Sequence, residues 1–314
     1  MTKVMTLKNH LKNLKINGQT MSWTVSHLSD NKTLNEYLSE ELHFSKRLIK
    51  LAKSPNALLS VNGKHRTVRY RVSKYDEISI KFPKEINNSS LVATKLPLDI
   101  IYEDDHLIVL NKKPGQVTVP SVDQRTTSLS NGLLYYYQLK GLPYTIHIVT
   151  RLDRDTSGLV LVAKHQYAHS LLSKLQIQNK INRIYASFIV GKLKQKQSII
   201  NAPIGRSLDS IIKREVTTRG DSAITHYKVI KEYLDYSYLE ITLETGRTHQ
   251  IRVHFSHLGH PLVGDDLYGS ESKQIKRQAL HCKKIEFTHP ITGKYIQLTA
   301  PLPEDMLKLF DKQP

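Results

Sequence analysis

The sequence predicts an α+β protein in two parts, and three observations lead to this prediction. The 314 residues are 39% apolar, which is enough for a real core in a chain long enough for two domains. In the first third, leucines at helical spacing precede a strong signal for a hairpin turn. Further on, patterns typical of strands alternate with patterns typical of helices. We therefore expect a basic tail (1–20), a small module (21–81), a linker (82–97) and a larger domain (98–314).

The charge balance indicates a polyanionic partner. The chain carries 46 Lys and Arg against 28 Asp and Glu, a net charge of +18, and such a field attracts nucleic acid at long range. No apolar run approaches the roughly 18 residues of a membrane span, and no secretory signal is recognisable. The single cysteine, Cys282, excludes a disulfide framework and a thiolate metal cluster. We therefore expect a protein of the reducing cytoplasm that does not bind membranes.

The front module is predicted to hold two short helices and a basic hairpin. Leu34, Leu38 and Leu42 recur at helical spacing, and Ser45 offers the N-cap of a second helix. The dipeptide Asn62-Gly63 is a strong hairpin signal, because both residues accept the positive φ angles of a tight turn.

A pair of arginines follows this predicted turn. Val68, Tyr70 and Val72 alternate there with Arg69 and Arg71, so we expect both arginines on one face of a strand. Arginines placed in this way suit contacts with nucleic-acid phosphates.

The larger domain is predicted to alternate strands with helices. Strands are expected at "HLIVLNKK", "GLVLVAK", "RIYASFIVG" and "YLEITLETG". Helices are expected near residues 168–175 and within "RTHQIRVHFSHLGHP", where Gly259 and Pro261 end the second helix.

The loop "RLDRDTSG", residues 151–158, is the first candidate site. In an extended segment Arg151 and Asp153 point one way and Leu152 the other, so Leu152 can anchor the loop while Asp153 faces a cleft. Two interpretations stay open. Charged loops at strand ends often carry catalysis, and Asp153 and Asp155 can instead hydrogen-bond their own backbone in a tight turn.

Two further stretches carry candidate residues. In "TGRTHQIR", at a strand-to-helix junction, Arg247 and Arg252 can converge on an anion, or they can be phosphate-binding or surface arginines. Tyr185 lies on the strand face opposite Ile184 and Ala186 and can stack on a nucleobase. Most of the 16 tyrosines are nevertheless expected to be packing residues.

No metal ion or nucleotide cofactor is predicted. Four histidines lie close together without a zinc-binding pattern or a cysteine pair: His249, His254, His257 and His260. The acidic pairs Asp104-Asp105 and Asp265-Asp266 are expected in turns. The sequence also lacks a GxxxxGK[ST] phosphate-binding loop, a GxGxxG motif after a strand and a GxSxG nucleophile elbow.

Six motifs follow one another from about Asp99 to the C-terminus: "TRLDRDTSGLVLVAK", "NRIYASFIVG", "IINAPIGR", "GDSAITHYKVI", "LETGRTHQIRVHFSHLGHPLVGDDLYG" and "ALHCKKIEFTHPITGKYIQLTAPLP". In this order they resemble the pseudouridine synthases of the RluA class. The section from about Ser22 to Lys81 resembles the small RNA-binding module shared with ribosomal small-subunit protein four. Two positions depart from these patterns: Tyr75-Asp76 stands where the module usually has Gly-Asp, and Thr150 stands where many synthases have histidine.

The resemblance implies a catalytic domain with a mixed, largely antiparallel central sheet flanked by helices. A central cleft would bind RNA, with Ile251 on the wall of its pocket. The implied reaction is the isomerisation of uridine to pseudouridine within RNA: the bond from ribose to the ring nitrogen breaks, the uracil turns, and its carbon 5 joins the sugar. No cofactor is expected. A structured loop or bulge is the expected target, because base extraction costs less there than in a duplex.

The resemblance also implies roles for individual side chains. Asp153 matches the catalytic aspartate, and Tyr185 matches the tyrosine that stacks on the target base and takes part in proton movement at carbon 5. Arg151 corresponds to the arginine that fills the gap left by the extracted base. We expect Arg252, or otherwise Arg247, to hold Asp153 ionised and oriented.

Other functions stay open on the sequence alone. A non-catalytic RNA-binding protein, such as a ribosome assembly factor, would not need Asp153, and a base-excising glycosidase would release free uracil. For the RNA target, the front module favours large-subunit ribosomal RNA over transfer RNA. We expect a monomer that needs no protein partner.

Overall fold

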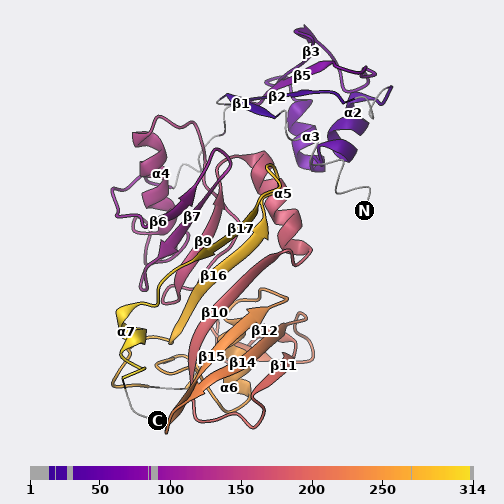
Figure 1. The fold of residues 1–314 in the computed structure, drawn as a ribbon. Helices are drawn as coiled ribbons and strands as arrows, with labels where there is room; N and C mark the ends of the chain where they lie inside the picture. Colours follow the sequence, from indigo (N-terminus) through magenta and orange to yellow (C-terminus); the bar gives the residue numbers. More distant parts are fainter. Residues whose placement is uncertain are drawn as a thin grey trace.

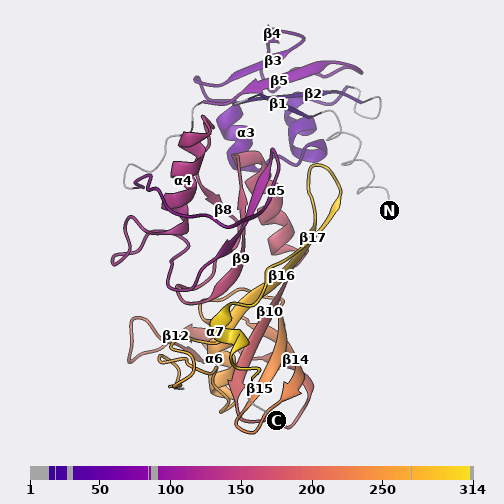
Figure 2. The same cartoon turned by 60° about the vertical axis from the view of Figure 1, so that its left-hand side comes forward.

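The computed structural model describes residues 14–17, 19–26, 31–83, 85, 91–269 and 271–311. Within these residues two sheets dominate the fold (Figure 1), one of five strands in the front module and one of ten strands in the larger domain. The module and helix α5 (Gln166–Ile177) lie at one end of the large sheet, and helix α6 (Gln250–His257) lies at the other (Figure 2). None of the described helices is long and apolar enough to cross a membrane.

The front module contains the predicted helices and hairpin turn. Its sheet has the order β1-β2-β5-β3-β4, and these strands are, in chain order, Lys15–Asn17, Thr20–Thr24, Leu58–Val61, Lys64–His65 and Glu77–Lys81. Helix α2 (Leu34–Glu36) continues as the π-helix η2 (Tyr37–Glu41), and the Ser45 side chain caps α3 (Lys46–Ala52). Strand β1 lies within the predicted tail, so the sheet begins before residue 21. The tail up to residue 13 lies outside the described residues.

The strand expected to carry Arg69 and Arg71 is wrong. Asn62 and Gly63 do form the turn, with φ angles of 51° and 73°, but the strand after it ends at His65. Three carbonyls of this segment accept hydrogen bonds from backbone amides at or just before the start of α2. The Val68 carbonyl accepts from Asn35 N at 2.9 Å, that of Tyr70 from Leu34 N at 2.7 Å, and that of Val72 from Asn31 N at 2.8 Å. The segment therefore pairs with a helix start and not with a hairpin partner, and its arginines are exposed outside any strand.

The large sheet is mixed and largely antiparallel, as expected. Its order is β11-β14-β15-β10-β16-β9-β7-β6, with β17 paired to β16 and β8 paired to β9. Among the described pairs, β16 with β9 is parallel and the others are antiparallel. The strands are β6 (Ile100–Glu103), β7 (Leu107–Lys112), β8 (His147–Ile148), β9 (Ser157–Ala163), β10 (Ile181–Val190), β11 (Gln197–Asn201), β14 (Ile224–Glu232), β15 (Tyr236–Leu243), β16 (Leu280–Thr288) and β17 (Tyr295–Thr299). A separate hairpin joins β12 (Ile204–Arg206) to β13 (Arg214–Val216), and two further helices are α4 (Leu129–Leu139) and α7 (Glu304–Leu307).

Strand β9, which follows the charged loop, lies at the centre of this core. All seven of its residues are buried, as its nearly continuous apolar sequence predicts for a strand covered on both faces. It pairs with β7 on one side and with β16 on the other. The charged loop therefore runs directly into a buried strand at the centre of the sheet, which holds the C-terminal end of the loop in place.

The front module packs on the larger domain through aromatic side chains. The Tyr167 hydroxyl on α5 donates to the Leu42 carbonyl at 2.6 Å, and the Tyr167 ring lies 4.8 Å from Phe44 and 6.1 Å from Trp23. The described residues of the predicted linker contain no helix or strand. The front module thus contacts the larger domain directly through its described residues.

Candidate active site

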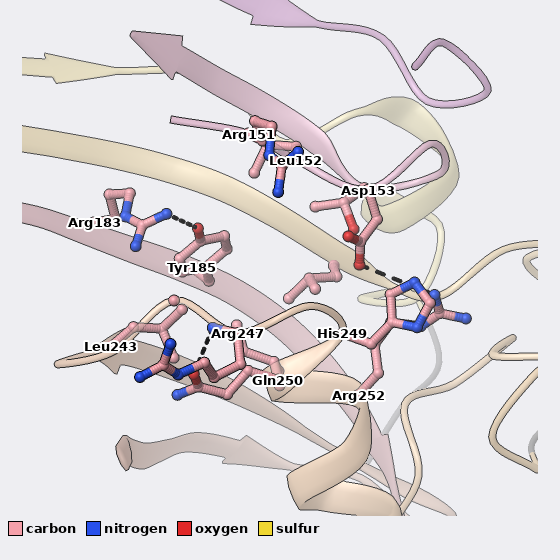
Figure 3. Close-up of a pocket in the computed structure, with 14 residues that line it drawn as sticks. Arg151, Leu152, Asp153, Arg183, Tyr185, Leu243, Arg247, His249, Gln250 and Arg252 are labelled. Carbon is pink, nitrogen blue, oxygen red and sulfur yellow. Dashed lines mark hydrogen bonds and ion pairs between the residues drawn. The ribbon is translucent and has the colours of Figure 1, made fainter. Parts of the chain in front are cut away.

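One pocket of the larger domain collects most of the predicted site residues (Figure 3). It lies between the loop that precedes β9, strand β10, the end of β15 and the start of α6. Six of the eight predicted residues line it: Arg151, Asp153, Tyr185, Arg247, Ile251 and Arg252. The other two, Arg69 and Arg71, are exposed on the front module.

The loop that carries Asp153 is both a tight turn and a wall of the pocket. The Thr156 amide donates to the Asp153 carbonyl at 3.2 Å, so the turn interpretation holds for the backbone. Leu152 is buried, and its carbonyl accepts a hydrogen bond from the Thr118 hydroxyl at 2.9 Å. The Asp153 carboxylate is 30% exposed and faces the pocket (Figure 3), where a substrate can reach it.

A buried ion pair holds Arg252 beside Asp153. The Nε and Nη2 atoms of Arg252 each lie 2.7 Å from a carboxylate oxygen of Asp265, which is fully buried. The third nitrogen, Nη1, lies 3.9 Å from Asp153 Oδ2, and the Tyr268 ring lies 5.0 Å from the guanidinium carbon. Burial opposes the charge of Arg252, but the bonds to Asp265 outweigh it and raise the pKa of the guanidinium. Arg252 is therefore a fixed cation shared between two carboxylates.

Asp265 is the main site residue that the sequence prediction missed. It was expected in a turn, and it does accept a hydrogen bond from the Tyr268 amide at 3.1 Å. Its bidentate bond reaches an arginine thirteen residues earlier, on a different element. The sequence did contain one signal for this ion pair, because Asp265-Asp266 follows soon after the predicted helix that carries Arg252. A tight turn explained the same acidic residues, so the pair was not predicted.

Arg247 is directed differently from Arg252. Its Nε donates to the Ser222 carbonyl at 3.0 Å, and its Nη1 lies 3.6 Å from Asp221 Oδ2. The side chain is 41% exposed at the pocket edge. Of the two arginines considered for contact with Asp153, Arg252 is thus the one that forms an ion pair with it among the described residues.

Tyr185 is buried in the wall of the pocket. A register shift in the pairing of β10 with β16 falls between Ile184 and Tyr185, and such irregularities redirect side chains. Burial raises the pKa of the Tyr185 phenol, while the nearby Arg183 acts in the opposite direction. Arg183 Nη1 lies 3.3 Å from the hydroxyl (Figure 3), a pocket cation that the sequence analysis did not single out.

The start of α6 is shaped by His249 and Gln250. His249 adopts a left-handed conformation with φ of 57°, lines the pocket and shares a hydrogen bond of 3.0 Å with the Tyr268 hydroxyl. Burial lowers the pKa of its imidazole, so the neutral form is favoured. The Gln250 side chain accepts from Arg247 N at 3.0 Å and donates to Ile224 O at 3.0 Å, which ties the turn to β14.

The pocket thus combines one accessible carboxylate, fixed guanidinium groups and a buried phenol. A carboxylate suits nucleophilic attack, and a phenol beside a cation suits proton transfer. In the described ranges, no cluster of three or more His, Cys, Asp or Glu side chains has an arrangement that could hold a metal ion.

Comparison with known proteins assigns the family. Residues 106–257 match the family model described as RNA pseudouridylate synthase. A relative from Bacillus subtilis (strain 168), named uncharacterized RNA pseudouridine synthase YjbO, is 47% identical over 278 residues, which are 88% of this chain and 98% of the relative. The chain belongs to the RNA pseudouridine synthase family. The synthase is therefore an isomerase that acts on RNA, and the RluA class expected from the six motifs is confirmed.

Further relatives agree with this assignment. Ribosomal large subunit pseudouridine synthase D of Nitrosomonas europaea is 38% identical over 262 residues, which cover 80% of the synthase and 76% of the relative. Among solved structures, human RNA pseudouridylate synthase domain containing 1 superimposes with a TM-score of 0.55 at 25% identity, covering 66% of the synthase and 84% of the human chain. The predicted fold of the catalytic domain is thereby confirmed.

Proposed function

We propose that this synthase uses Asp153 as its catalytic carboxylate and that its target is a uridine in large-subunit ribosomal RNA. The observation that supports the first part is the series of ion pairs from Asp265 to Arg252 and from Arg252 to Asp153, whose carboxylate lines the same pocket as Tyr185. A guanidinium fixed by one buried carboxylate orients a second carboxylate and stabilises its charge. The arrangement suits a reaction that needs one ionised acid at a defined place.

In the proposed reaction, Asp153 attacks the nucleotide or assists the departure of uracil, so that the bond from C1′ to N1 breaks. The uracil turns in the pocket and its carbon 5 forms the new bond to C1′. Carbon 5 then loses its proton and N1 gains one, so substrate and product are isomers. Tyr185 stacks on the base and takes part in the proton movement, and Arg183 stabilises any negative charge on its oxygen.

The remaining predicted residues have binding roles in this proposal. Arg151 is exposed at the pocket, where it can occupy the space of the extracted base, and Ile251 forms part of the wall. Arg69 and Arg71 are exposed on the front module, where they can contact RNA phosphates. The Arg71 side chain also donates to the Asn31 carbonyl at 2.8 Å, and this hydrogen bond restricts the rotation of the side chain.

Two observations support ribosomal RNA as the target. The front module is strongly basic in sequence, and several relatives of 37–39% identity are named ribosomal large subunit pseudouridine synthase D. Pseudouridine mapping by carbodiimide-dependent reverse-transcription stops, in cells with and without the gene, tests this choice. We expect one reverse-transcription stop to disappear from large-subunit ribosomal RNA in cells without the gene. If a stop disappears from a transfer RNA instead, the target is a transfer RNA.

Release of tritium from RNA labelled at carbon 5 of uridine tests the role of Asp153. The Asp153→Asn variant is expected to release none while it still binds RNA, because the amide cannot act as a nucleophile. Asp155→Asn, two positions along the same loop, is the matched control, since its carboxylate pairs with Arg154. Full release by Asp153→Asn would refute the assignment, and free uracil among the products would indicate a glycosidase.

A monomeric state and a cytoplasmic location stay predictions.

A further inference from the structure

The Asp153 loop is held by two buried basic side chains that donate hydrogen bonds to its backbone. Lys112, at the end of β7, donates from Nζ to the Arg154 carbonyl at 2.8 Å. Arg277, just before β16, donates from Nη1 to the Asp155 carbonyl at 2.9 Å. Two successive carbonyls directly after Asp153 are therefore fixed by side chains from two other parts of the chain.

Arg277 has a second set of partners in the C-terminal segment. Its Nε lies 2.7 Å from Asp305 Oδ2 and its Nη2 lies 2.9 Å from Asp305 Oδ1, a bidentate pair with helix α7. The guanidinium is planar, so this pair fixes the direction of the remaining nitrogen, Nη1. That nitrogen points at the Asp155 carbonyl, with the Gln278 carbonyl also within 3.1 Å.

We propose that Arg277 is a positioning residue for the Asp153 loop and that Asp305 sets its orientation. This inference rests on the proposed role of Asp153. The carbonyl held by Arg277 lies two residues after Asp153, and the Thr156 amide closes the turn back onto the Asp153 carbonyl at 3.2 Å. A shift at Asp155 is therefore transmitted to Asp153 through a closed turn.

We expect the pair of Arg277 and Asp305 to affect the reaction by positioning the Asp153 loop and not by changing the net charge near the pocket. The Arg277 cation is matched by the Asp305 carboxylate, so the pair has no net charge near the pocket. A displacement of about 1 Å at a reacting group lowers rates by up to about 100-fold. The alternative is that the pair only fastens α7 to the sheet, in which case its loss lowers stability and leaves the reaction unchanged.

Asp305→Asn in the full-length protein separates these two cases. Because the Asp305 side chain is 37% exposed, the variant is expected to fold. The matched control is Glu103→Gln, which removes the carboxylate from the pair with Lys164 at the opposite end of β9. Lys164 and Arg277 are equally buried, with 8% of each side chain exposed.

The assay is single-turnover tritium release at saturating enzyme, with carbon-5-labelled total RNA from a strain that lacks the gene. Asp305→Asn is expected to lower the saturated rate by about 10-fold to 100-fold and to leave RNA affinity, from filter binding, within about twofold of wild type. Asp305→Glu, which keeps the charge, is expected to recover part of the rate. Glu103→Gln is expected to lower the unfolding midpoint with an unchanged rate.

An Asp305→Asn variant with a wild-type rate and a lower unfolding midpoint would overturn the proposal, because the pair would then be only structural. A loss confined to RNA affinity would overturn it as well. Asp153→Asn is measured in the same assay. If that variant keeps the wild-type rate, the role of Asp153 fails, whichever result Asp305→Asn gives.

Discussion

The substitution Asp265→Asn tests how the pocket holds its central cation. Asp265 is fully buried and binds Arg252 through two hydrogen bonds of 2.7 Å. The asparagine has nearly the same shape but no charge and only one acceptor oxygen. It therefore removes one of the two bonds and leaves a buried guanidinium without its main counter-charge.

The structure gives the expected size of this effect. Removing one partner of a buried ion pair costs about 3–5 kcal/mol, and the acceptor that asparagine keeps favours the lower end, about 3 kcal/mol. Arg252 also loses the contact that fixes its orientation toward Asp153, which lies 3.9 Å from Nη1. We therefore expect the saturated rate to fall by about tenfold or more.

Urea unfolding followed by circular dichroism measures the stability, and single-turnover tritium release measures the rate. Asp266→Asn is the matched control, because it makes the same change one position along the chain at an exposed side chain. Its unfolding free energy is expected to stay within about 0.5 kcal/mol of wild type. If the two variants unfold alike and react alike, Asp265 does not hold Arg252 in solution and the reasoning fails.

Three further predictions concern the fold. Burial lowers the pKa of His281 to about 4, so below pH 6.5 the unfolded chain binds a proton that the folded chain does not. Stability measured by urea unfolding should thus fall with decreasing pH, by up to about 1.4 kcal/mol per unit between pH 6.5 and 4, and a flat profile would contradict this. Gly158→Ala places a methyl group against the Cys282 backbone and should unfold at much lower temperature than Gly141→Ala, whose surroundings are open. Tyr167→Phe removes one hydrogen bond between module and domain and should cost about 1 kcal/mol; an unchanged unfolding curve would argue against that bond.

Local patterns predicted most of the elements that frame the site. The strand predicted at "YLEITLETG" was confirmed as part of β15, where Leu239 and Ile241 are fully buried and Glu240 between them is partly exposed. The cap at Ser45 and the turn at Asn62 were confirmed because these residues act on their own neighbours. The strand after that turn was wrong, since alternation over five residues does not reveal which distant backbone will pair with it.

The sequence by itself determined the family, the charged loop, the place of Asp153 at the edge of a buried strand and the candidates around it. Motif order and short-range periodicity carry this information along the chain. Only the tertiary structure decided which arginine lies beside Asp153, and it supplied the buried partner Asp265 and the pair of Arg277 with Asp305. These contacts join residues that meet only when separate elements cross, and a hydrogen bond depends on distances and directions that spacing along a chain does not specify.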